Sequence, residues 1–309
     1  MTALSAAAAV VAPGGAIAAA YASEHEDLHP STRENVREAM EGEAFAYASY
    51  RAYAVQAGRE HLRQVRRVYE QTADVELNEH FAEQGELTGL VGDNAANLRD
   101  AISGESYEAT TMYRQFAAQA RQDGDTEAAE RFAEIAEDEA DHRATFVQAL
   151  RAITHPSSGA TIPTDVTAEP VSIPAGGPRV SSRRTLRNLE TAMRGEALAY
   201  AKYTFYARQA KESGQPRLAM LFWRTAQVEL TEHFAEEATL AGLVRDTATN
   251  LRTSIKGEIR EGRQMYPHFA REAASAGDHE AAALLAETGR DELAHARRFA
   301  EVGHRRSGA

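Results

Sequence analysis

Nine residues, VELNEHFAE at Val75–Glu83, return almost unchanged as VELTEHFAE at Val228–Glu236. The spacing of their apolar residues predicts a helix in both places. Both copies nevertheless put glutamates and a histidine on the face that such a helix buries against its neighbours. The chemistry of the protein must explain these acids.

The whole chain repeats with one spacing. His80 and His233 are 153 residues apart, and so are Glu105 and Glu258. A constant spacing indicates one unit duplicated without net insertion, and therefore one fold present twice. We place the copies at 32–153 and 184–304, after a tail at 1–31. The segment 154–183 holds five of the nine prolines, with Gly and Ser, and is predicted to be an extended linker.

Each copy contains four segments with helical apolar spacing, which predicts an all-α bundle from each copy. The segments are Thr32–Gln56, Glu60–Glu83, Asn94–Gln122 and Thr126–Ile153, then Arg184–Glu212, Pro216–Glu236, Thr247–Ser275 and Asp278–Val302. The link between the second and third helices, Gln84–Asp93, reaches at most about 33 Å. A bundle of eighteen-residue helices is about 27 Å long. A crossover along the bundle and a plain up-down-up-down order are therefore both open.

Every predicted helix places acid or imidazole on its inward face near mid-length. Burying such groups unpaired costs several kcal/mol each, and no Lys or Arg lies at the same level of these faces. Two divalent or trivalent metal ions would neutralise five carboxylates and two imidazoles per copy. The candidate ligands are Glu43, Glu76, His80, Glu105, Glu108, Glu139 and His142 in the first copy, and Glu196, Glu229, His233, Glu258, Glu261, Glu292 and His295 in the second.

Composition excludes several other classes of protein. The absence of cysteine rules out disulfides, zinc ribbons and thiolate-held iron within these 309 residues. The net charge of −12 argues against nucleic acid as a partner. Residues 1–22 are uncharged and Ala-rich but interrupted by Pro13-Gly14-Gly15, so no membrane span is expected. This run is either a disordered tail of a cytoplasmic protein or an export signal ending at Ala20-Tyr21-Ala22.

The chain resembles the rubrerythrin family of the ferritin-like superfamily over about 34–150 and 187–302. The resemblance lies in GEA at 42–44 and 195–197, GESYEATTMY at 104–113, GEIREGRQMYP at 257–267, and the Glu-x-x-His pairs at Glu139 and Glu292. It implies two fused ferritin-like four-helix bundles, each copy holding two metal ions, with iron expected and manganese or zinc as alternatives. It also places the family's extra carboxylate on Glu108 and Glu261. The tyrosines near the metals fall on Tyr50, Tyr113, Tyr203 and Tyr266.

Two features depart from the family pattern. The second helix has Glu76 and His80 four residues apart where the family has three, which places Glu79 at the family's histidine position. Either His80 and His233 bind metal through a local π-bulge, or Glu79 and Glu232 replace them. The family's cysteine-held iron is also missing, so the electron donor is unidentified.

The resemblance implies reduction of peroxide at each metal pair, with Glu76 and Glu139 bridging the metals of the first copy. Ferroxidase activity with oxygen as substrate is the first alternative. A metal-stabilised scaffold without catalysis is the second. Single-bundle relatives dimerise, so the fusion is expected to act as an internal pseudo-dimer, and further homo-oligomerisation is open.

Overall fold

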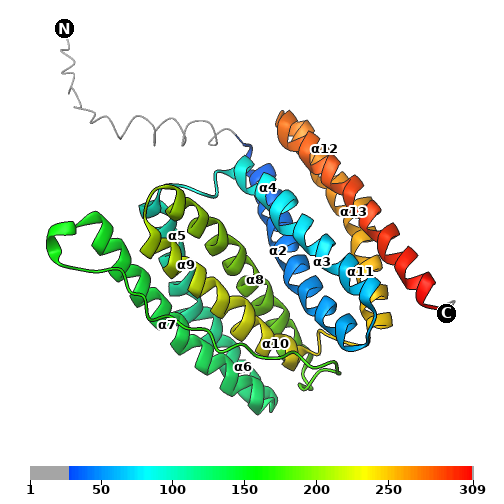
Figure 1. Cartoon of the computed structure of the whole chain (residues 1–309), viewed down its shortest axis with the longest axis horizontal. Coiled ribbons are helices and arrows are strands. Elements are labelled where there is room, and N and C mark those ends of the chain that lie inside the picture. Colours follow the sequence, from blue (N-terminus) through cyan, green and yellow to red (C-terminus); the bar gives the residue numbers. More distant parts are fainter. Residues whose placement is uncertain (1–27, 308–309) are drawn as a thin grey trace, which may run out of the picture.

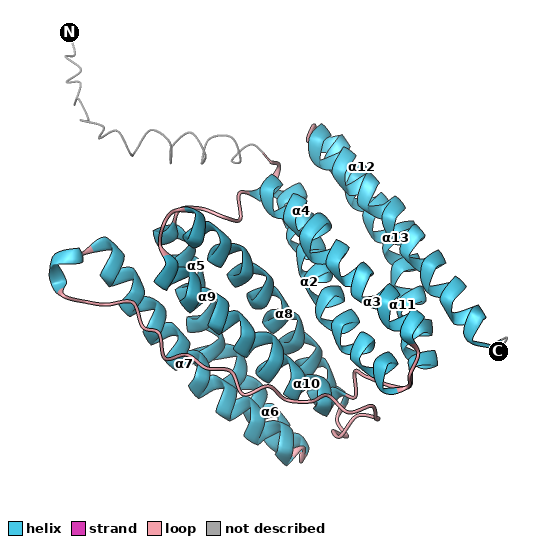
Figure 2. Ribbon diagram, viewed as in Figure 1, coloured by secondary structure: helices cyan, strands magenta, loops and turns pink. Residues whose placement is uncertain are grey.

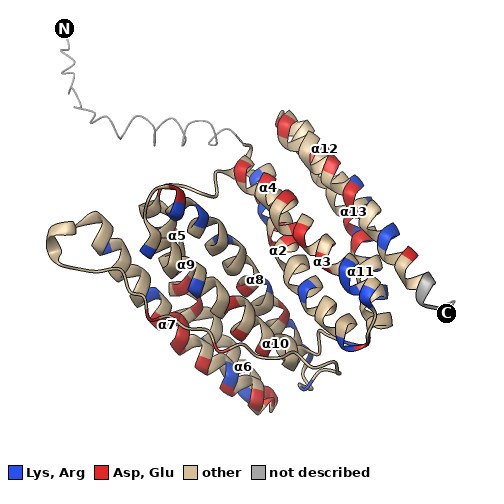
Figure 3. Cartoon of the chain, in the orientation of Figure 1, with Lys and Arg blue, Asp and Glu red and all other residues tan. Residues whose placement is uncertain are grey.

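The computed structural model describes residues 28–307, and within this range the regular structure is helical with no strand (Figures 1 and 2). The two alternatives for residues 1–22 concern a segment outside the described residues. No helix between residues 28 and 307 combines the length and apolarity that a bilayer crossing requires. Acidic and basic residues are interspersed along the helices (Figure 3).

The first copy forms helices at the predicted places, with two π-helical turns inserted. In order these are α2 (Pro30–Arg59), α3 (Arg63–Val75), η1 (Glu76–His80), α4 (Phe81–Thr88), α5 (Asn94–Tyr107), η2 (Glu108–Met112), α6 (Tyr113–Asp123) and α7 (Thr126–Thr154). A short 3₁₀ turn, η3 (Pro156–Ser158), opens the linker. Gly124 ends α6 in the left-handed conformation that glycine adopts without strain.

The second copy repeats the same order. Its elements are α8 (Arg183–Glu212), α9 (Pro216–Val228), η4 (Glu229–His233), α10 (Phe234–Ala241), α11 (Thr247–Arg260), η5 (Glu261–Met265), α12 (Tyr266–Ala276) and α13 (His279–Ser307). Pro216 opens α9, where its missing N–H costs nothing.

Each bundle combines helices from both copies, so the expectation that each copy folds into its own bundle is wrong. One bundle contains α2–α4 of the first copy with α11–α13 of the second, and the other contains α5–α7 with α8–α10 (Figure 1). Aromatic contacts cross between the copies in both cores. The rings of Tyr69 and Phe299 are 4.8 Å apart, and those of Phe146 and Phe222 are 5.3 Å apart.

The links between the second and third helices explain this exchange. The second helix continues through Thr88, so only residues 89–93 are non-helical, instead of the ten expected. Five residues span at most about 17 Å, which is too short to run back along a bundle about 27 Å long. The short link therefore excludes a crossover within one bundle. Instead of turning back in the up-down-up-down order, the chain passes from the end of α4 to the neighbouring bundle, and the equivalent link at 242–246 returns it.

The starts of the two copies are held in an equivalent way. Asp125, at the start of α7, accepts hydrogen bonds from the backbone N–H groups of Ser181 and Ser182 at 2.7 and 3.1 Å. Asp278, at the start of α13, accepts one from the N–H of His29 at 3.0 Å. Each copy's first helix is thus anchored by an aspartate of the other copy.

Helices α2 and α8 join the two bundles. At their contact the rings of Tyr47 and Tyr200 stack with centroids 5.3 Å apart, and their hydroxyls are 3.0 Å apart. These residues are 153 positions apart in the sequence, so equivalent faces of the two copies meet there. The fold is therefore an internal pseudo-dimer, as expected, but one in which the two copies exchange helices.

The linker is extended but also docked onto the second copy. The N–H groups of Val171, Gly176 and Arg179 donate to carbonyls of Thr231, Val244 and Leu240 at 2.7, 2.9 and 2.8 Å. Gly242 lies beneath this segment with φ of 65°. A Cβ there would lie 2.4 Å from the backbone nitrogen of Pro178.

We expect Gly242→Ala to lower the free energy of unfolding more than Gly277→Ala. Both glycines end a helix with positive φ, but nothing lies within 4 Å of a Cβ at Gly277. The matched control therefore reports only the backbone strain, about 1 kcal/mol. Gly242→Ala adds the clash with the linker, for a total of roughly 2–4 kcal/mol. Denaturant unfolding of both variants measures the difference, and equal losses would contradict the docking of the linker.

Candidate metal centres

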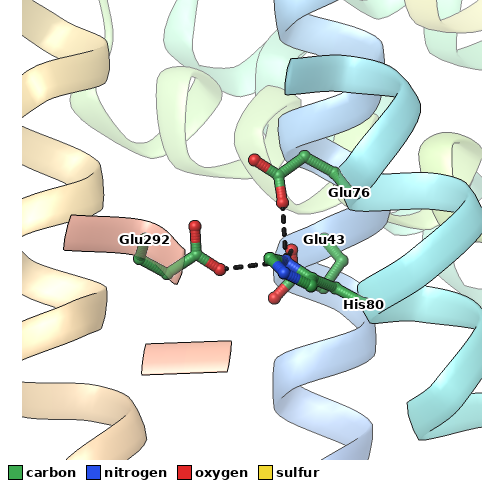
Figure 4. A group of neighbouring side chains, drawn as sticks. All are labelled: Glu43, Glu76, His80 and Glu292. Carbon is green, nitrogen blue, oxygen red and sulfur yellow. Dashed lines mark hydrogen bonds and ion pairs between the residues drawn. The ribbon is translucent and has the colours of Figure 1, made fainter. Parts of the chain in front are cut away.

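Acids and histidines from both copies meet in the middle of each bundle. Centre I consists of two overlapping groups of buried ligand atoms, Glu43, Glu76, His80 and Glu292, and Glu76, Glu258, Glu292 and His295. Figure 4 shows the first group, with His80 between Glu76 and Glu292. Glu76 and Glu292 belong to both groups, so they are placed to bridge two metal ions.

The geometry of centre I is nearly two-fold symmetric. His80 Nδ1 lies 2.9 Å from Glu76 Oε2, 3.2 Å from Glu292 Oε1 and 3.6 Å from Glu43 Oε2. His295 Nδ1 lies 3.1 Å from Glu292 Oε2, 3.2 Å from Glu76 Oε1 and 3.7 Å from Glu258 Oε2. Each histidine thus faces one terminal glutamate and the same two bridging glutamates.

Centre II repeats this arrangement in the other bundle. Its groups are Glu105, Glu139, His142 and Glu229, and Glu139, Glu196, Glu229 and His233. His142 Nδ1 lies 2.9 Å from Glu139 Oε2 and 3.2 Å from Glu229 Oε1. His233 Nδ1 lies 3.0 Å from Glu139 Oε1 and 3.1 Å from Glu229 Oε2.

The predicted candidates therefore come together, but in different sets from those expected. Glu76 and Glu139, expected to bridge one metal pair, lie in different centres. Glu76 pairs with Glu292, and Glu139 pairs with Glu229. The exchange of helices described above is the cause, because it brings the third and fourth helices of one copy to the first and second helices of the other.

A π-helical turn brings His80 to the centre. The turn η1 covers Glu76–His80, so its wider winding places residues four apart on one face. His80 is buried while Glu79 is exposed. In the second copy η4 does the same for His233, and Glu232 instead accepts a hydrogen bond from the N–H of Glu169 in the linker at 2.9 Å. The geometry favours the histidines over Glu79 and Glu232 as ligands.

The remaining candidates surround the two centres. Glu108 and Glu261 begin the π-turns η2 and η5 and lie outside the four-residue groups. Tyr203 Oη donates to Glu105 Oε1 at 2.5 Å. Short hydrogen bonds of the same kind join Tyr50 to Glu258, Tyr113 to Glu196 and Tyr266 to Glu43. Each predicted tyrosine thus contacts a terminal glutamate of the centre that it faces.

Burial and crowding control the charges at both centres. Burial raises the pKa of the terminal glutamates Glu43, Glu105, Glu196 and Glu258 well above the ordinary value. Burial opposes protonation of His295, but Glu258, Glu292 and Glu76 raise its pKa to about 12. The raised pKa values of these glutamates and of His295 show that the crowded carboxylates favour positive charge, as protons, at the centres. A metal pair would replace those protons.

The donor set fits a pair of metal ions. Several buried ligand atoms have no hydrogen-bond partner, among them Glu76 Oε1, Glu139 Oε1, Glu258 Oε2 and Glu292 Oε1. Each of these oxygens lies 3.0–3.7 Å from a histidine Nδ1 without a hydrogen bond to it, and a buried carboxylate oxygen in this state is costly unless a cation lies beside it. Oxygen with imidazole nitrogen suits iron, manganese or zinc, and the absence of thiolate does not select among them.

Sequence reasoning missed two aspartates at the outer edge of the centres. Asp291 Oδ2 lies 3.8 Å from His80 Nε2, and Asp138 Oδ2 lies 3.6 Å from His233 Nε2. These contacts are too long for hydrogen bonds, but a carboxylate near the far nitrogen of a ligand histidine favours the tautomer that leaves the near nitrogen free to bind metal. The repeated pair Asp-Glu at 138–139 and 291–292 is the signal that could have revealed them.

We expect Asp291→Asn to weaken metal binding at centre I by about tenfold and to leave centre II unchanged. Asp138→Asn should have the reverse effect, which makes each variant the control for the other. Titration with zinc, followed by calorimetry, resolves the two affinities. Equal weakening of both centres by either variant would contradict this assignment.

Comparison with known proteins identifies the relatives of the chain. A family model described as Rubrerythrin matches residues 34–150, 187–234 and 227–303. A rubrerythrin of Porphyromonas gingivalis is 35% identical over 133 residues, covering 39% of the chain and 66% of the relative. Nigerythrin of Nitratidesulfovibrio vulgaris is 36% identical over 128 residues, covering 37% of the chain and 63% of the relative. A rubrerythrin of that organism is 36% identical over 129 residues, covering 38% of the chain and 67% of the relative.

The chain thus spans about two thirds of the length of these curated relatives, and slightly less for the first two. No solved structure gives a significant match to the chain.

Proposed function

The chain belongs to the rubrerythrin family, and we propose that it is a non-haem di-iron oxidoreductase that reduces hydrogen peroxide at two metal centres. The observation that carries the proposal is that each centre has two overlapping groups of ligands. The two groups share a pair of glutamates, and each group adds one terminal glutamate and one histidine. Two ferrous ions held there would supply the two electrons that convert one hydrogen peroxide to two water molecules.

The residues around each centre have separate roles in this reaction. In centre I, Glu76 and Glu292 would be shared by the two metal ions, while Glu43 with His80 and Glu258 with His295 would hold one ion each. Tyr50 and Tyr266 fix the terminal glutamates Glu258 and Glu43 by donating their hydroxyl hydrogens to them. In centre II the same roles fall to Glu139 and Glu229, to Glu105 with His142 and Glu196 with His233, and to Tyr203 and Tyr113.

Glu108 and Glu261 are proposed as additional carboxylates that follow changes of charge. Burial, with Glu139 and Glu229, raises the pKa of Glu108 to about 8, and burial, with Glu292 and Glu76, raises that of Glu261 to about 7. Each can therefore gain or lose a proton near neutral pH. Such a group can compensate a change of one charge at the adjacent metal pair.

Electrons must return to the centres from a separate donor. The sequence has no cysteine, so these 309 residues cannot hold a thiolate-bound iron. Each centre draws all its candidate ligands from one chain, so neither needs a second subunit. A homo-oligomer remains a prediction that the mass of the protein in solution would test.

Anaerobic loading with iron followed by one equivalent of peroxide per centre tests the proposed function. We expect about four irons per chain and rapid, stoichiometric oxidation by peroxide. Iron that ignores peroxide but reacts with oxygen would instead indicate a ferroxidase. Retention of redox-silent zinc from the native host would indicate a structural metal site.

A further inference from the structure

The two centres differ at one buried position next to a tyrosine. Gln84 of α4 and Glu237 of α10 are 153 residues apart and equally inaccessible to solvent. At centre I, Gln84 Nε2 donates to Tyr266 Oη at 3.1 Å, and Tyr266 Oη donates to Glu43. Each contact in this chain of hydrogen bonds has one donor and one acceptor without a proton on either side chain beyond the amide and hydroxyl hydrogens, although Gln84 Oε1 itself has no partner.

Centre II cannot be satisfied in the same way. Tyr113 Oη donates to Glu196 and also lies 2.9 Å from Glu237 Oε1. A tyrosine hydroxyl has one hydrogen, so it cannot make a full hydrogen bond to both carboxylates. One of the two carboxyl groups must be the donor in the second contact.

Glu237 is the better candidate for the donor. Glu196 faces His233, with Nδ1 3.7 Å from its Oε2, and belongs to the metal-binding group. Glu237 lies outside that group, and no Lys or Arg pairs with it among the side chains described, residues 28–304. Its Oε2 has no hydrogen-bond partner. Burial raises the pKa of Glu237 well above its usual range, in agreement with this geometry.

We infer that Glu237 holds a proton and donates it to Tyr113 Oη, so that centre II has a proton source beside its tyrosine that has no counterpart beside Tyr266 at centre I. The relay runs from the Glu237 carboxyl to Tyr113 Oη and on to the carboxylate oxygen of Glu196 that accepts the hydrogen bond of Tyr113. Glu237 acts through Tyr113 and is therefore a proton-supplying residue without contact to the metals. Gln84 cannot play this part, because an amide has no dissociable proton near neutral pH.

The inference deepens the proposed function and rests on it for its use. Breaking the O–O bond of hydrogen peroxide to give two waters consumes two electrons and two protons. The electrons come from the metal pair, one proton comes from Glu237 through Tyr113, and the second comes from solvent. Glu237 afterwards regains its proton from solvent. Centre II is thus expected to react faster with peroxide than centre I.

Infrared difference spectra of the zinc-loaded full chain test the protonation of Glu237 without any redox chemistry. We expect Glu237→Gln to remove one carbonyl stretching band of a protonated carboxylic acid. Tyr113→Phe should shift that band, because the hydrogen bond is lost. Gln84→Glu should add a band at centre I. Glu83 is exposed and precedes Gln84 in the sequence, so Glu83→Gln serves as the control and should change no carboxylic acid band.

Glutamine already occupies the equivalent site beside Tyr266, so Glu237→Gln is expected to fold. If it removes only carboxylate bands and no carboxylic acid band, the inference is overturned. The same holds if the control variant removes the acid band equally. Zinc content measured beforehand ensures that both centres are filled in every sample.

Single-turnover oxidation of the iron-loaded protein by peroxide then tests the consequence. We expect two phases, and Glu237→Gln should slow the faster one by about tenfold or more. Two phases that Glu237→Gln leaves unchanged would overturn the role of Glu237 in proton supply. Absence of any reaction with peroxide, with the acid band present, would overturn the proposed function and leave the protonation of Glu237 standing.

Discussion

Two double variants with the same number of lost carboxylates should differ completely in metal content. Glu76→Ala with Glu292→Ala removes both bridging ligands of centre I and leaves centre II intact. Glu76→Ala with Glu139→Ala removes one bridging ligand from each centre. We expect the first variant to bind about two irons per chain and the second close to none, because loss of a bridging carboxylate weakens both metals of a pair.

This comparison tests the exchange of helices directly. If each copy formed its own bundle, Glu76 and Glu139 would share a centre, and the variant lacking both would keep about two irons. Metal analysis of the purified proteins, with circular dichroism to verify helix content, distinguishes the two arrangements. Peroxide-dependent oxidation should persist at half the wild-type stoichiometry in Glu76→Ala with Glu292→Ala.

Helix positions and the family could be predicted from the sequence, and both are confirmed by the structure and the family match. Apolar spacing determines which residues face inward along a helix, so the acids of both metal centres could be predicted, whereas the buried Glu237 was missed. The residues alone left open whether His80 or Glu79 faces inward. The structure buries His80 because the π-turn adds one residue to the local winding.

The pairing of helices could not be predicted from the same signals. Glu43 and Glu196 are equivalent in a duplicated sequence, so pairing within a copy and pairing between copies produce identical patterns. The link after Thr88 is shorter than expected because Gln84–Thr88 is helical, which excludes a crossover within one bundle but does not by itself choose between the two pairings. The difference between Gln84 and Glu237 was visible in the sequence, but its meaning depends on the contact of each with a tyrosine of the other copy.

Removal of metal should reverse the pH dependence of stability between about pH 5 and 8. Burial raises the pKa of Glu261 from 4.5 to about 7 and that of Glu108 from 4.5 to about 8. Both carboxyls then bind a proton more tightly in the folded protein than in the unfolded chain. Their contribution to stability is full below about pH 4.5 and is lost as the pH rises through 7 and 8.

The histidines act in the same direction in the metal-free protein. The pKa of His295 is raised to about 12, so its contribution is also lost as the pH rises. The lowered pKa of Glu76, about 2, acts in the opposite sense but only below pH 4.5, outside this window. We expect the metal-free protein to lose roughly 3–5 kcal/mol between pH 5 and 8, after allowance for the partial exposure of Glu108 and Glu261.

The loaded protein should behave in the opposite way, because ligands must be deprotonated to bind metal. Its stability should rise with pH, so chelation should lower Tm by roughly 10–20 °C at pH 8 and by much less at pH 5. Thermal unfolding with and without chelator at the two pH values measures both slopes.

Glu108→Gln with Glu261→Gln should flatten the dependence of stability on pH in the metal-free protein, since an amide does not titrate. A metal-free protein that becomes more stable as the pH rises would show that these carboxyls are ionised in the fold, and that metal is not needed to offset their burial.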